Sequence, residues 1–244
     1  MRPMADLDPR RRRAIGLAIG IPIAIALVAW ALTYSPLFHA RHIRVQGNRT
    51  LSAKEVTALA AVGSSTNVVH LDEAPIVARL TSDPWIAGAS VHADLPGTLV
   101  ISVEERAPIG VISALGDTAL LASDGTELPF SKALADGLPT VRAGIGMPDD
   151  AQRAAAAAML SALDPVVSRR VAGVIVGQDG IMTLTLTSGA TVDAGVAGEE
   201  PAKAAALRGV LRWASSKGLD LRSIDISAPA APSATLADGS TFTP

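Results

Sequence analysis

One uninterrupted apolar stretch near the start of the chain limits what the protein can be more than any other feature. Residues 14–34 read AIGLAIGIPIAIALVAWALTY and contain no charged side chain. At about 1.5 Å per residue, a helix of this length matches the roughly 30 Å hydrocarbon core of a bilayer. Because backbone polar groups in lipid must be satisfied within the segment, this stretch is predicted to be a single transmembrane helix.

The residues that flank this stretch predict its orientation. Trp30 and Tyr34 lie near its far end, where aromatic side chains favour the membrane–water interface. Its near end directly follows four arginines, and positively charged flanks stay in the cytoplasm: Arg10, Arg11, Arg12 and Arg13. The sequence therefore predicts a cytoplasmic tail over 1–13, a membrane anchor over 14–34 and an extracytoplasmic remainder, in a single-pass type II topology.

Two alternatives concern this anchor, which begins at Ala14. The segment Ala29-Trp30-Ala31 resembles a signal-peptide cleavage site, but the apolar core of a signal peptide is only about 7–15 residues long. A retained anchor is therefore favoured over a cleaved signal. Gly16 and Gly20 have the spacing that lets two membrane helices approach closely, although an Ala/Gly-rich span produces this spacing by chance, so helix pairing stays open.

Beyond residue 34 the pattern changes to short strands and amphipathic helices. Ser52 and Glu55 form a capping box at the start of a helix that Gly63 is expected to end. The alternation of apolar residues predicts the order strand, helix, helix, strand, strand, over residues 42–45, 52–62, 72–80, 85–93 and 98–105. Two helices on one face of a three-stranded sheet can bury a core of their own, so residues 35–106 are predicted to form an α+β domain.

The rest of the chain reads as a second domain, over residues 107–228. Its strands are separated by Asp-Gly and Ser-Gly turns, and its last helix carries Leu207, Val210, Leu211 and Ala214 on one face. This pattern predicts a mixed α/β domain with a mainly antiparallel sheet. Residues 229–244 form an edge segment or tail, because the run APAAP at 228–232 has weak strand propensity and leaves a full final strand in doubt.

Signals for chemistry are weak throughout the sequence. The chain has no cysteine, which excludes disulfides, thiolate zinc sites and a cysteine nucleophile, and its net charge of −2 argues against duplex nucleic-acid binding. Four histidines lack metal-ligand spacing, and no phosphate-binding or nucleophile motif is present. Asp193, Glu199 and Glu200 could form a carboxylate cation site, but they are better interpreted as acids at a helix start. We therefore expect no catalytic residue, metal, cofactor or small-molecule substrate.

A set of spaced motifs in both domains resembles one known family. The first domain resembles a POTRA domain, and the whole pattern is similar to the FtsQ/DivIB cell-division family. In the first domain the resemblance rests on Ile43, Val45, Gly47, Asn48, Ser52, Glu55, Val56, Gly63, Pro84, Trp85, Val91, Pro96, Leu99, Ile101, Val103, Glu105, Arg106 and Pro108. In the second it rests on Asp124-Gly125, Val192, Gly195, Lys203 and the run from Ile224 to Pro229.

The resemblance implies a bitopic scaffold of the bacterial divisome at the division septum. It implies FtsL-like and FtsB/DivIC-like bitopic partners, contact with membrane lipid and a part in controlling septal peptidoglycan synthesis. A sheet edge can accept a partner strand, because its backbone groups are unpaired. The expected partner-binding residues are therefore those of the late strand region: Ile224, Asp225, Ile226, Ser227, Thr235 and Leu236.

Two other function classes stay open. A POTRA-bearing secretion or outer-membrane assembly component needs a barrel of many strands with aromatic girdles. Only three aromatic residues follow residue 106, namely Phe130, Trp213 and Phe242, which counts against a barrel. A secreted hydrolase would need a site that no motif here indicates. Glu105 and Arg106 are interpreted as a solvated pair, because adjacent strand residues point to opposite faces.

Overall fold

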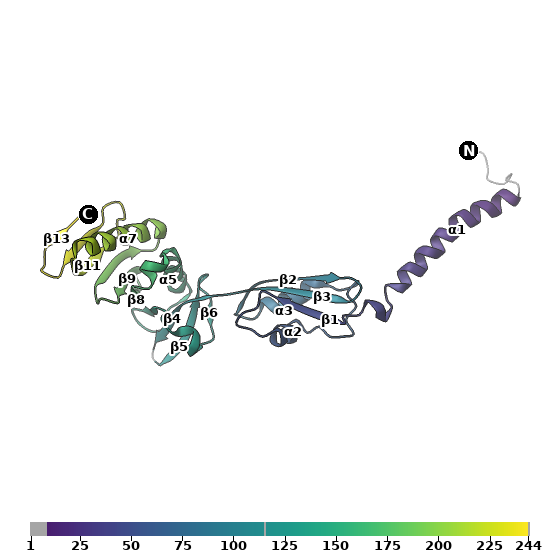
Figure 1. Cartoon of the computed structure of the whole chain (residues 1–244), viewed down its shortest axis with the longest axis horizontal. Helices are drawn as coiled ribbons and strands as arrows, with labels where there is room; N and C mark the ends of the chain where they lie inside the picture. The colour runs from purple at the N-terminus through teal and green to yellow at the C-terminus, as the bar shows by residue number, and fades with distance from the viewer. Residues whose placement is uncertain (1–8, 115, 244) are drawn as a thin grey trace. The chain divides into compact units, whose positions relative to one another are not determined.

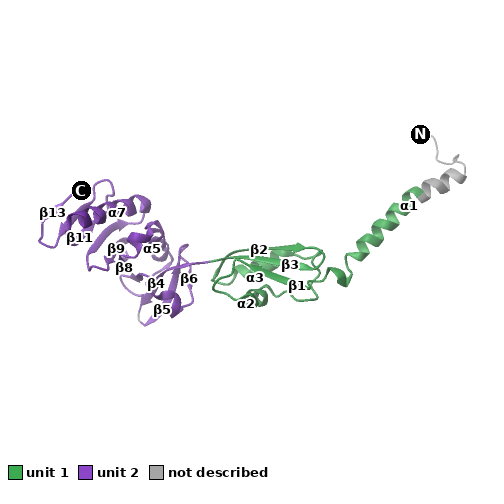
Figure 2. Cartoon of the chain, viewed as in Figure 1, with its two compact units in different colours: residues 1–105 green, residues 106–244 purple. Residues whose placement is uncertain are grey.

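The computed structural model describes the backbone of residues 9–114 and 116–243, and side chains from residue 18 onward. The chain divides into two compact units, residues 1–105 and 106–244 (Figure 2). Each unit is described by itself below.

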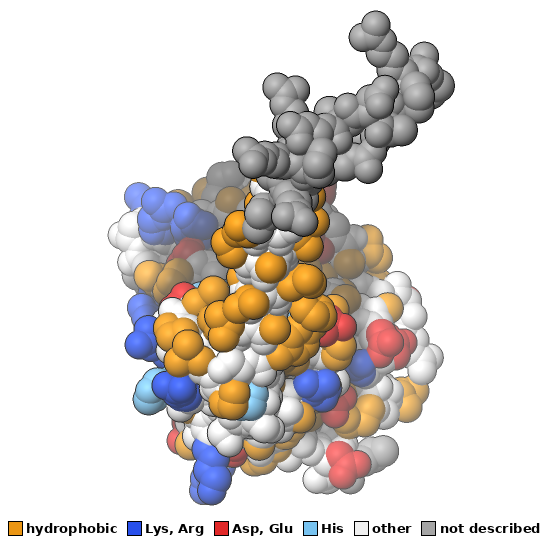
Figure 3. Space-filling model, turned by 90° about the vertical axis from the view of Figure 1, so that its right-hand side faces the viewer, with side chains coloured by type: hydrophobic (Ala, Val, Ile, Leu, Met, Phe, Trp, Pro, Cys, Tyr) orange, Lys and Arg blue, Asp and Glu red, His pale blue; other side chains and the backbone are white. Residues whose placement is uncertain are grey.

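The first unit begins with one long helix, α1 (Pro9–Leu32), in which Pro22 is internal. Apolar side chains such as Ile19, Ile25 and Trp30 are more than half exposed along it. Figure 3 shows hydrophobic side chains, in orange, directly below the grey residues. The side chains of Arg10 to Arg13, Ala14 and Gly16 lie outside the described residues. Around Gly20 a Cβ atom would meet nothing within 4 Å. Within the described part of the chain, no helix combines the length and the apolar character needed to cross a membrane.

A short 3-10 helix, η2 (Pro36–Phe38), leads from α1 into a βααββ module. Its elements are β1 (His42–Gln46), α2 (Ala53–Ala60), α3 (Glu73–Thr81), β2 (Ile86–Asp94) and β3 (Thr98–Glu105). The central strand β3 pairs in parallel with β1 and antiparallel with β2, as Figure 1 also shows. The predicted order of elements is confirmed.

Both helices bury an apolar face against this sheet. Ile43 and Val45 of β1 are partly buried and pack against the core. The buried core itself joins residues of the other four elements: Val56, Ala60, Ile76, Leu80, Ile86, Val91, Leu99, Ile101 and Val103. Ser52 and Glu55 form the predicted capping box at the start of α2. The predicted end at Gly63 is wrong by a few residues. Ala61 already adopts a left-handed conformation with φ of 51°, and the Arg79 guanidinium donates to the Ala60 carbonyl oxygen at 2.6 and 3.1 Å, which caps the shorter helix.

The second unit is built on one ten-stranded sheet, in the order β13-β12-β11-β10-β9-β8-β7-β4-β5-β6. The strands are β4 (Pro108–Ala114), β5 (Asp117–Ala122), β6 (Glu127–Leu128), β7 (Thr140–Ala143), β8 (Val171–Val176), β9 (Ile181–Leu186), β10 (Thr191–Val196), β11 (Leu221–Asp225), β12 (Ser233–Leu236) and β13 (Thr241–Phe242). Three pairings are parallel (β4–β7, β7–β8 and β10–β11) and the other six are antiparallel. The sheet is therefore mixed, with antiparallel pairs in the majority.

Helices α4 (Lys132–Ala135), α5 (Asp150–Ala162), α6 (Pro165–Ser168) and α7 (Glu200–Lys217) complete this unit. The apolar face of α7 that the sequence predicts, from Leu207 to Ala214, is buried. Helices α5 and α7 contact each other, and their buried faces are rich in alanine: Ala156, Ala157, Ala204 and Ala214. Small side chains let the helix backbones approach the sheet closely, so much of the core volume comes from the strands, through residues such as Val174, Met182 and Leu184.

Candidate partner-binding site

The end of the chain extends the large sheet by three strands. β11 lies beside β10, with Ile224 opposite Val192, and β12 returns antiparallel to it, with Ala234 opposite Ile224. The last strand, β13, pairs antiparallel with β12 and places Phe242 opposite Ala234. Residues 228–232 form no strand, as their composition predicts, but a final strand does form after them, which answers the question that the sequence left open.

The hydrogen-bond pattern identifies which backbone groups face outward at this end of the sheet. The Leu236 N–H donates to the Ser240 carbonyl at 2.9 Å, so the pair Ala234–Phe242 exchanges both hydrogen bonds. Because backbone groups alternate in direction along a strand, the N–H and C=O of Thr241 point away from β12. Thr241 is exposed, and its backbone is therefore the part of β13 that another strand can pair with.

A tight turn holds β13 against β12. The Asp238 carboxylate accepts hydrogen bonds from the Ser240 hydroxyl at 2.6 Å and the Ser240 N–H at 2.9 Å. The Ser240 hydroxyl and then its amide hold the pKa of Asp238 below its usual value. Gly239 has a φ of 90°, which glycine adopts without strain, and its N–H donates to the Leu236 carbonyl. The hairpin is thus fixed by its own residues.

An aromatic stack supports β13 from the helix layer. The rings of Trp213 on α7 and Phe242 on β13 lie parallel, with an interplanar angle of 7° and centroids 4.0 Å apart. Phe242 keeps 38% of its surface exposed. No local pattern in the sequence connects these two residues, although the scarcity of aromatic residues after residue 106 singles both of them out.

The structure brings the six predicted partner-binding residues together, but it does not place them at the free edge. Ile224 and Ile226 are 1% and 0% exposed, because both side chains point into the core. The Asp225 carboxylate accepts from the N–H and hydroxyl of Ser227. β11 is paired on both sides, and β12, which carries Thr235 and Leu236, is covered by β13. The outermost strand at this end of the sheet is β13, and partner binding by Ile224–Ser227 stays a prediction.

The neighbouring residues Glu105 and Arg106 each form hydrogen bonds to a different segment of the chain. Glu105 accepts hydrogen bonds from the N–H groups of Thr50 at 2.6 Å and Leu51 at 3.0 Å, and so ties the end of β3 to the loop before α2. Burial raises the pKa of Glu105, but these amides outweigh it and hold the pKa below its usual value. Arg106 donates to Asp124 at 2.6 Å within the second unit. These contacts give the two side chains separate structural roles.

The acidic residues near the start of α7 hold backbone turns. Asp193 accepts from the Gly195 N–H at 2.8 Å, and Glu200 accepts from the Gly198 N–H, which lowers the pKa of Glu200. Lys203 is only 3% exposed and donates its Nζ proton to the Val196 carbonyl, so it fixes the loop that enters α7. These contacts give the acids and the lysine a structural role.

The junction between α1 and the βααββ module depends on a residue that the sequence analysis did not single out. The His70 ring stacks on Tyr34 at 4.2 Å between centroids, and its Nε2 lies 2.8 Å from the Thr33 hydroxyl. Asn67 donates to the Thr33 carbonyl at 2.8 Å. Trp30 packs edge-on against Tyr34. Two residues that are predicted to lie at a membrane interface are thus part of an aromatic cluster.

The fold and its outer strand define a class: a two-unit α+β protein with a POTRA module followed by a mixed sheet that ends in a short exposed strand. The comparisons agree with this description. The family model "POTRA domain, FtsQ-type" matches residues 38–106, and the model "Cell division protein FtsQ/DivIB, C-terminal" matches residues 111–227.

Known proteins also match this chain. The cell division protein FtsQ of Mycobacteroides abscessus is 26% identical over 214 residues, which cover 86% of this chain and 67% of that protein. FtsQ of Syntrophotalea carbinolica is 33% identical over 113 residues, which cover 43% of this chain and 40% of that protein. The extracytoplasmic domain of DivIB from Geobacillus stearothermophilus is 14% identical, with a TM-score of 0.34 over 46% of this chain and 94% of that one. The chain belongs to the FtsQ/DivIB family of cell-division proteins.

Proposed function

We propose that this protein is a non-enzymatic, bitopic scaffold of the bacterial divisome that acts through protein–protein binding. In this proposal it links FtsL-like and FtsB/DivIC-like partners and helps to control septal peptidoglycan synthesis. The observation that carries the proposal is the combination of family membership over both units with a sheet whose last strand, β13, leaves the Thr241 backbone exposed. A partner strand that pairs beside β13 gains main-chain hydrogen bonds, and nearby side chains give selectivity.

The placement in the cell membrane is part of the same proposal. The uncharged run over 14–34 after four arginines supports a single-pass anchor with a cytoplasmic tail over 1–13. We assign residues 35–106 to the POTRA domain, 107–228 to the FtsQ-type β domain and 229–244 to the C-terminal edge segment. Both domains then lie outside the cytoplasm, at the septum. Protease protection of spheroplasts tests this topology, because the extracytoplasmic domains should be digested without lysis.

One substitution tests the proposed edge. In Thr241→Pro the backbone N–H that points away from β12 is removed, while the hydrogen bonds between Ala234 and Phe242 are left in place. We expect the variant to lose about tenfold or more in affinity for a purified FtsB/DivIC-like partner, as measured by biolayer interferometry. Thr241→Val is the matched control, because it keeps the N–H and a β-branched side chain.

Localisation provides the second measurement. A fluorescently tagged full chain should form a ring at the division septum, and Thr241→Pro should weaken retention of the partner there. Equal partner affinity for Thr241→Pro and Thr241→Val would argue against binding at β13. A diffuse cytosolic signal for the unmodified chain would instead refute the scaffold itself.

The other function classes have less support. A role in outer-membrane assembly or secretion rests on the POTRA module alone, whereas the second unit matches the FtsQ/DivIB C-terminal model. A secreted hydrolase needs free acid–base groups, but Asp193 and Glu200 bind backbone amides.

A further inference from the structure

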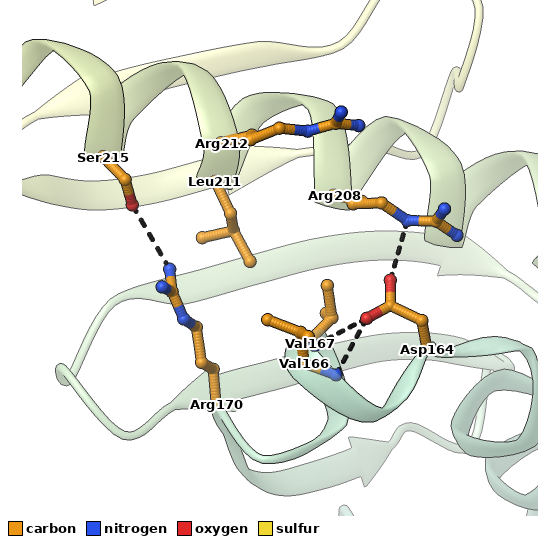
Figure 4. Close-up of a pocket in the computed structure, with 8 residues that line it drawn as sticks. All are labelled: Asp164, Val166, Val167, Arg170, Arg208, Leu211, Arg212 and Ser215. Atoms are coloured by element: carbon orange, nitrogen blue, oxygen red, sulfur yellow. Dashed lines mark hydrogen bonds and ion pairs between the residues drawn. The ribbon is translucent and has the colours of Figure 1, made fainter.

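A cavity of about 390 Å³ lies on the helix layer of the second unit, between α6 and α7. Its floor is apolar: Leu211 points from α7 toward Val166 and Val167 on α6, as Figure 4 shows. Val166 of α6 is 59% exposed beside this floor. The cavity falls in the size range of ligand-binding pockets, roughly 300–1,000 Å³.

The rim of this cavity carries the opposite charge to the unit that contains it. Residues 106–244 hold 11 Lys and Arg against 14 Asp and Glu, so the second unit is acidic. Yet three of its arginines, Arg170, Arg208 and Arg212, line this cavity together with one acid, Asp164. The rim of the cavity is therefore positively charged, although the unit as a whole is acidic.

These three arginines differ in the hydrogen bonds and ion pairs that their side chains form. Arg208 Nε lies 2.7 Å from Asp164 Oδ2, and the other oxygen of Asp164 caps α6 through the N–H groups of Val166 and Val167. Backbone amides and Arg208 together hold the pKa of Asp164 below its usual value. Among the described residues, the Arg170 guanidinium makes one hydrogen bond, a long one of 3.4 Å to the Ser215 hydroxyl. Arg212 has no hydrogen bond or ion pair within the described residues.

The spacing of the lining residues along α7 indicates the form of the occupant. Arg208, Leu211, Arg212 and Ser215 follow each other at i, i+3, i+4 and i+7, in a row about 10 Å long. A row of this kind, with an apolar centre and charges one helical turn apart, matches another amphipathic helix better than a compact anion.

We propose that the cavity between α6 and α7 binds a helical segment of a partner protein that inserts an aliphatic side chain above Leu211 and sets carboxylates against Arg212 and Arg170. This binding site is separate from the β13 edge and goes beyond the proposed function, because it needs no strand pairing. Charge-assisted hydrogen bonds to the two arginines would give the segment its orientation, and burial of Val166 would give it affinity.

The test places a photo-crosslinking amino acid at Val166 in the full-length chain, expressed in dividing cells of the source bacterium. The captured adduct is digested and sequenced. We expect a peptide with Asp or Glu within one helical turn of the captured aliphatic residue. Arg212→Glu combined with Arg170→Glu should reduce the adduct about tenfold or more, because the arginines would then repel these carboxylates.

Two controls make the result specific. Arg222→Glu changes the charge of an exposed arginine on β11, outside the cavity, and should leave the adduct unchanged. Arg212→Lys keeps the positive charge and should retain most of the adduct. Thermal melts of each variant establish that the second unit is folded, so that loss of the adduct reports on binding.

Several outcomes would overturn this inference. They are the absence of any Val166 adduct, capture of a glycan or a lipid, a captured peptide without carboxylates, and an adduct that is insensitive to the double arginine reversal. Septal localisation and Thr241-dependent partner binding, measured in the same strains, report on the proposed function separately. Failure at the cavity with normal localisation would therefore leave the scaffold proposal intact.

Discussion

The two sheets of this protein end in different ways. In the POTRA module the outer strands β1 and β2 are five and nine residues long, whereas both outer strands of the larger sheet, β6 and β13, have only two residues. Short edge strands limit indiscriminate pairing because they offer few free backbone groups. A partner that adds to β13 must therefore gain most of its selectivity from side chains, and the Phe242–Trp213 stack supplies the nearest large apolar surface.

The two cores also differ in how they are filled. The POTRA core is packed by branched aliphatic side chains from both helices and all three strands. In the second unit the helices add buried alanines, namely Ala156, Ala157 and Ala204, to larger residues such as Met159 and Leu207. Each unit nevertheless has its own closed core, which suggests that each unfolds as a separate cooperative transition.

The largest effect is expected from truncating one central strand residue in each core. Leu99 on β3 and Leu184 on β9 are both 0% exposed. Each change to alanine removes apolar contacts and leaves a cavity, which costs about 2–5 kcal/mol in the free energy of unfolding. In chemical denaturation followed by hydrogen exchange, Leu99→Ala should destabilise only the POTRA amides, and Leu184→Ala only those of the second unit. If either variant lowered both transitions equally, the two units would be one cooperative body.

An intermediate effect is expected at the end of β3. Glu105→Ala removes the acceptor for the amides of Thr50 and Leu51, so the POTRA module should lose about 1–3 kcal/mol. Glu104→Ala is the matched control, because Glu104 is exposed on the same strand and should change stability by less than about 0.5 kcal/mol.

The same carboxylate gives the POTRA module a dependence on pH. The pKa of Glu105 in the folded state lies below the usual value of 4.5. Its contribution is therefore complete above pH 4.5 and is lost as the pH falls through the lowered pKa, because protonation weakens both hydrogen bonds. In the unmodified chain, the free energy of unfolding of the POTRA module should fall between pH 6 and about pH 3. In Glu105→Gln the part of this fall that comes from Glu105 should be absent. An unchanged acid profile in that variant would contradict the assigned role.

Local features of both units could be predicted from the sequence, because neighbouring residues determine them. The Ser52–Glu55 capping box and the βααββ order depend on short-range patterns, and so does the buried stripe of α7. The position of β7 between β4 and β8 could not be predicted in this way. Its parallel pairings join segments that are distant in the sequence, and their register is set by packing across the whole sheet.

The sequence predicts the region of the candidate site, but it does not predict which strand forms the free edge of the sheet. Alternation of apolar residues correctly assigned Ile224 to a late strand, but it could not distinguish a strand paired on both sides from an outer one. That distinction depends on whether residues 241–242 return to pair with β12, and the return depends on the turn at Asp238–Gly239 and on the contact with Trp213. These are contacts between segments that no local pattern connects.

The smallest effect compares equivalent caps in the two units. Ser52 caps α2 in the POTRA module and Asp149 caps α5 in the second unit, each in a capping box with the residue three positions later. Ser52→Ala and Asp149→Ala should each cost about 1 kcal/mol, because one N-terminal amide loses its acceptor. The loss should be confined to the unit that carries the change, as measured by following the unfolding transition of each unit separately.

Asp149 also places negative charge at the helix N-terminus. The stability lost in Asp149→Ala should therefore exceed that lost in Ser52→Ala at low salt and approach it at high salt. Equal losses at every salt concentration would mean that the hydrogen bond alone, and not the charge, accounts for both caps.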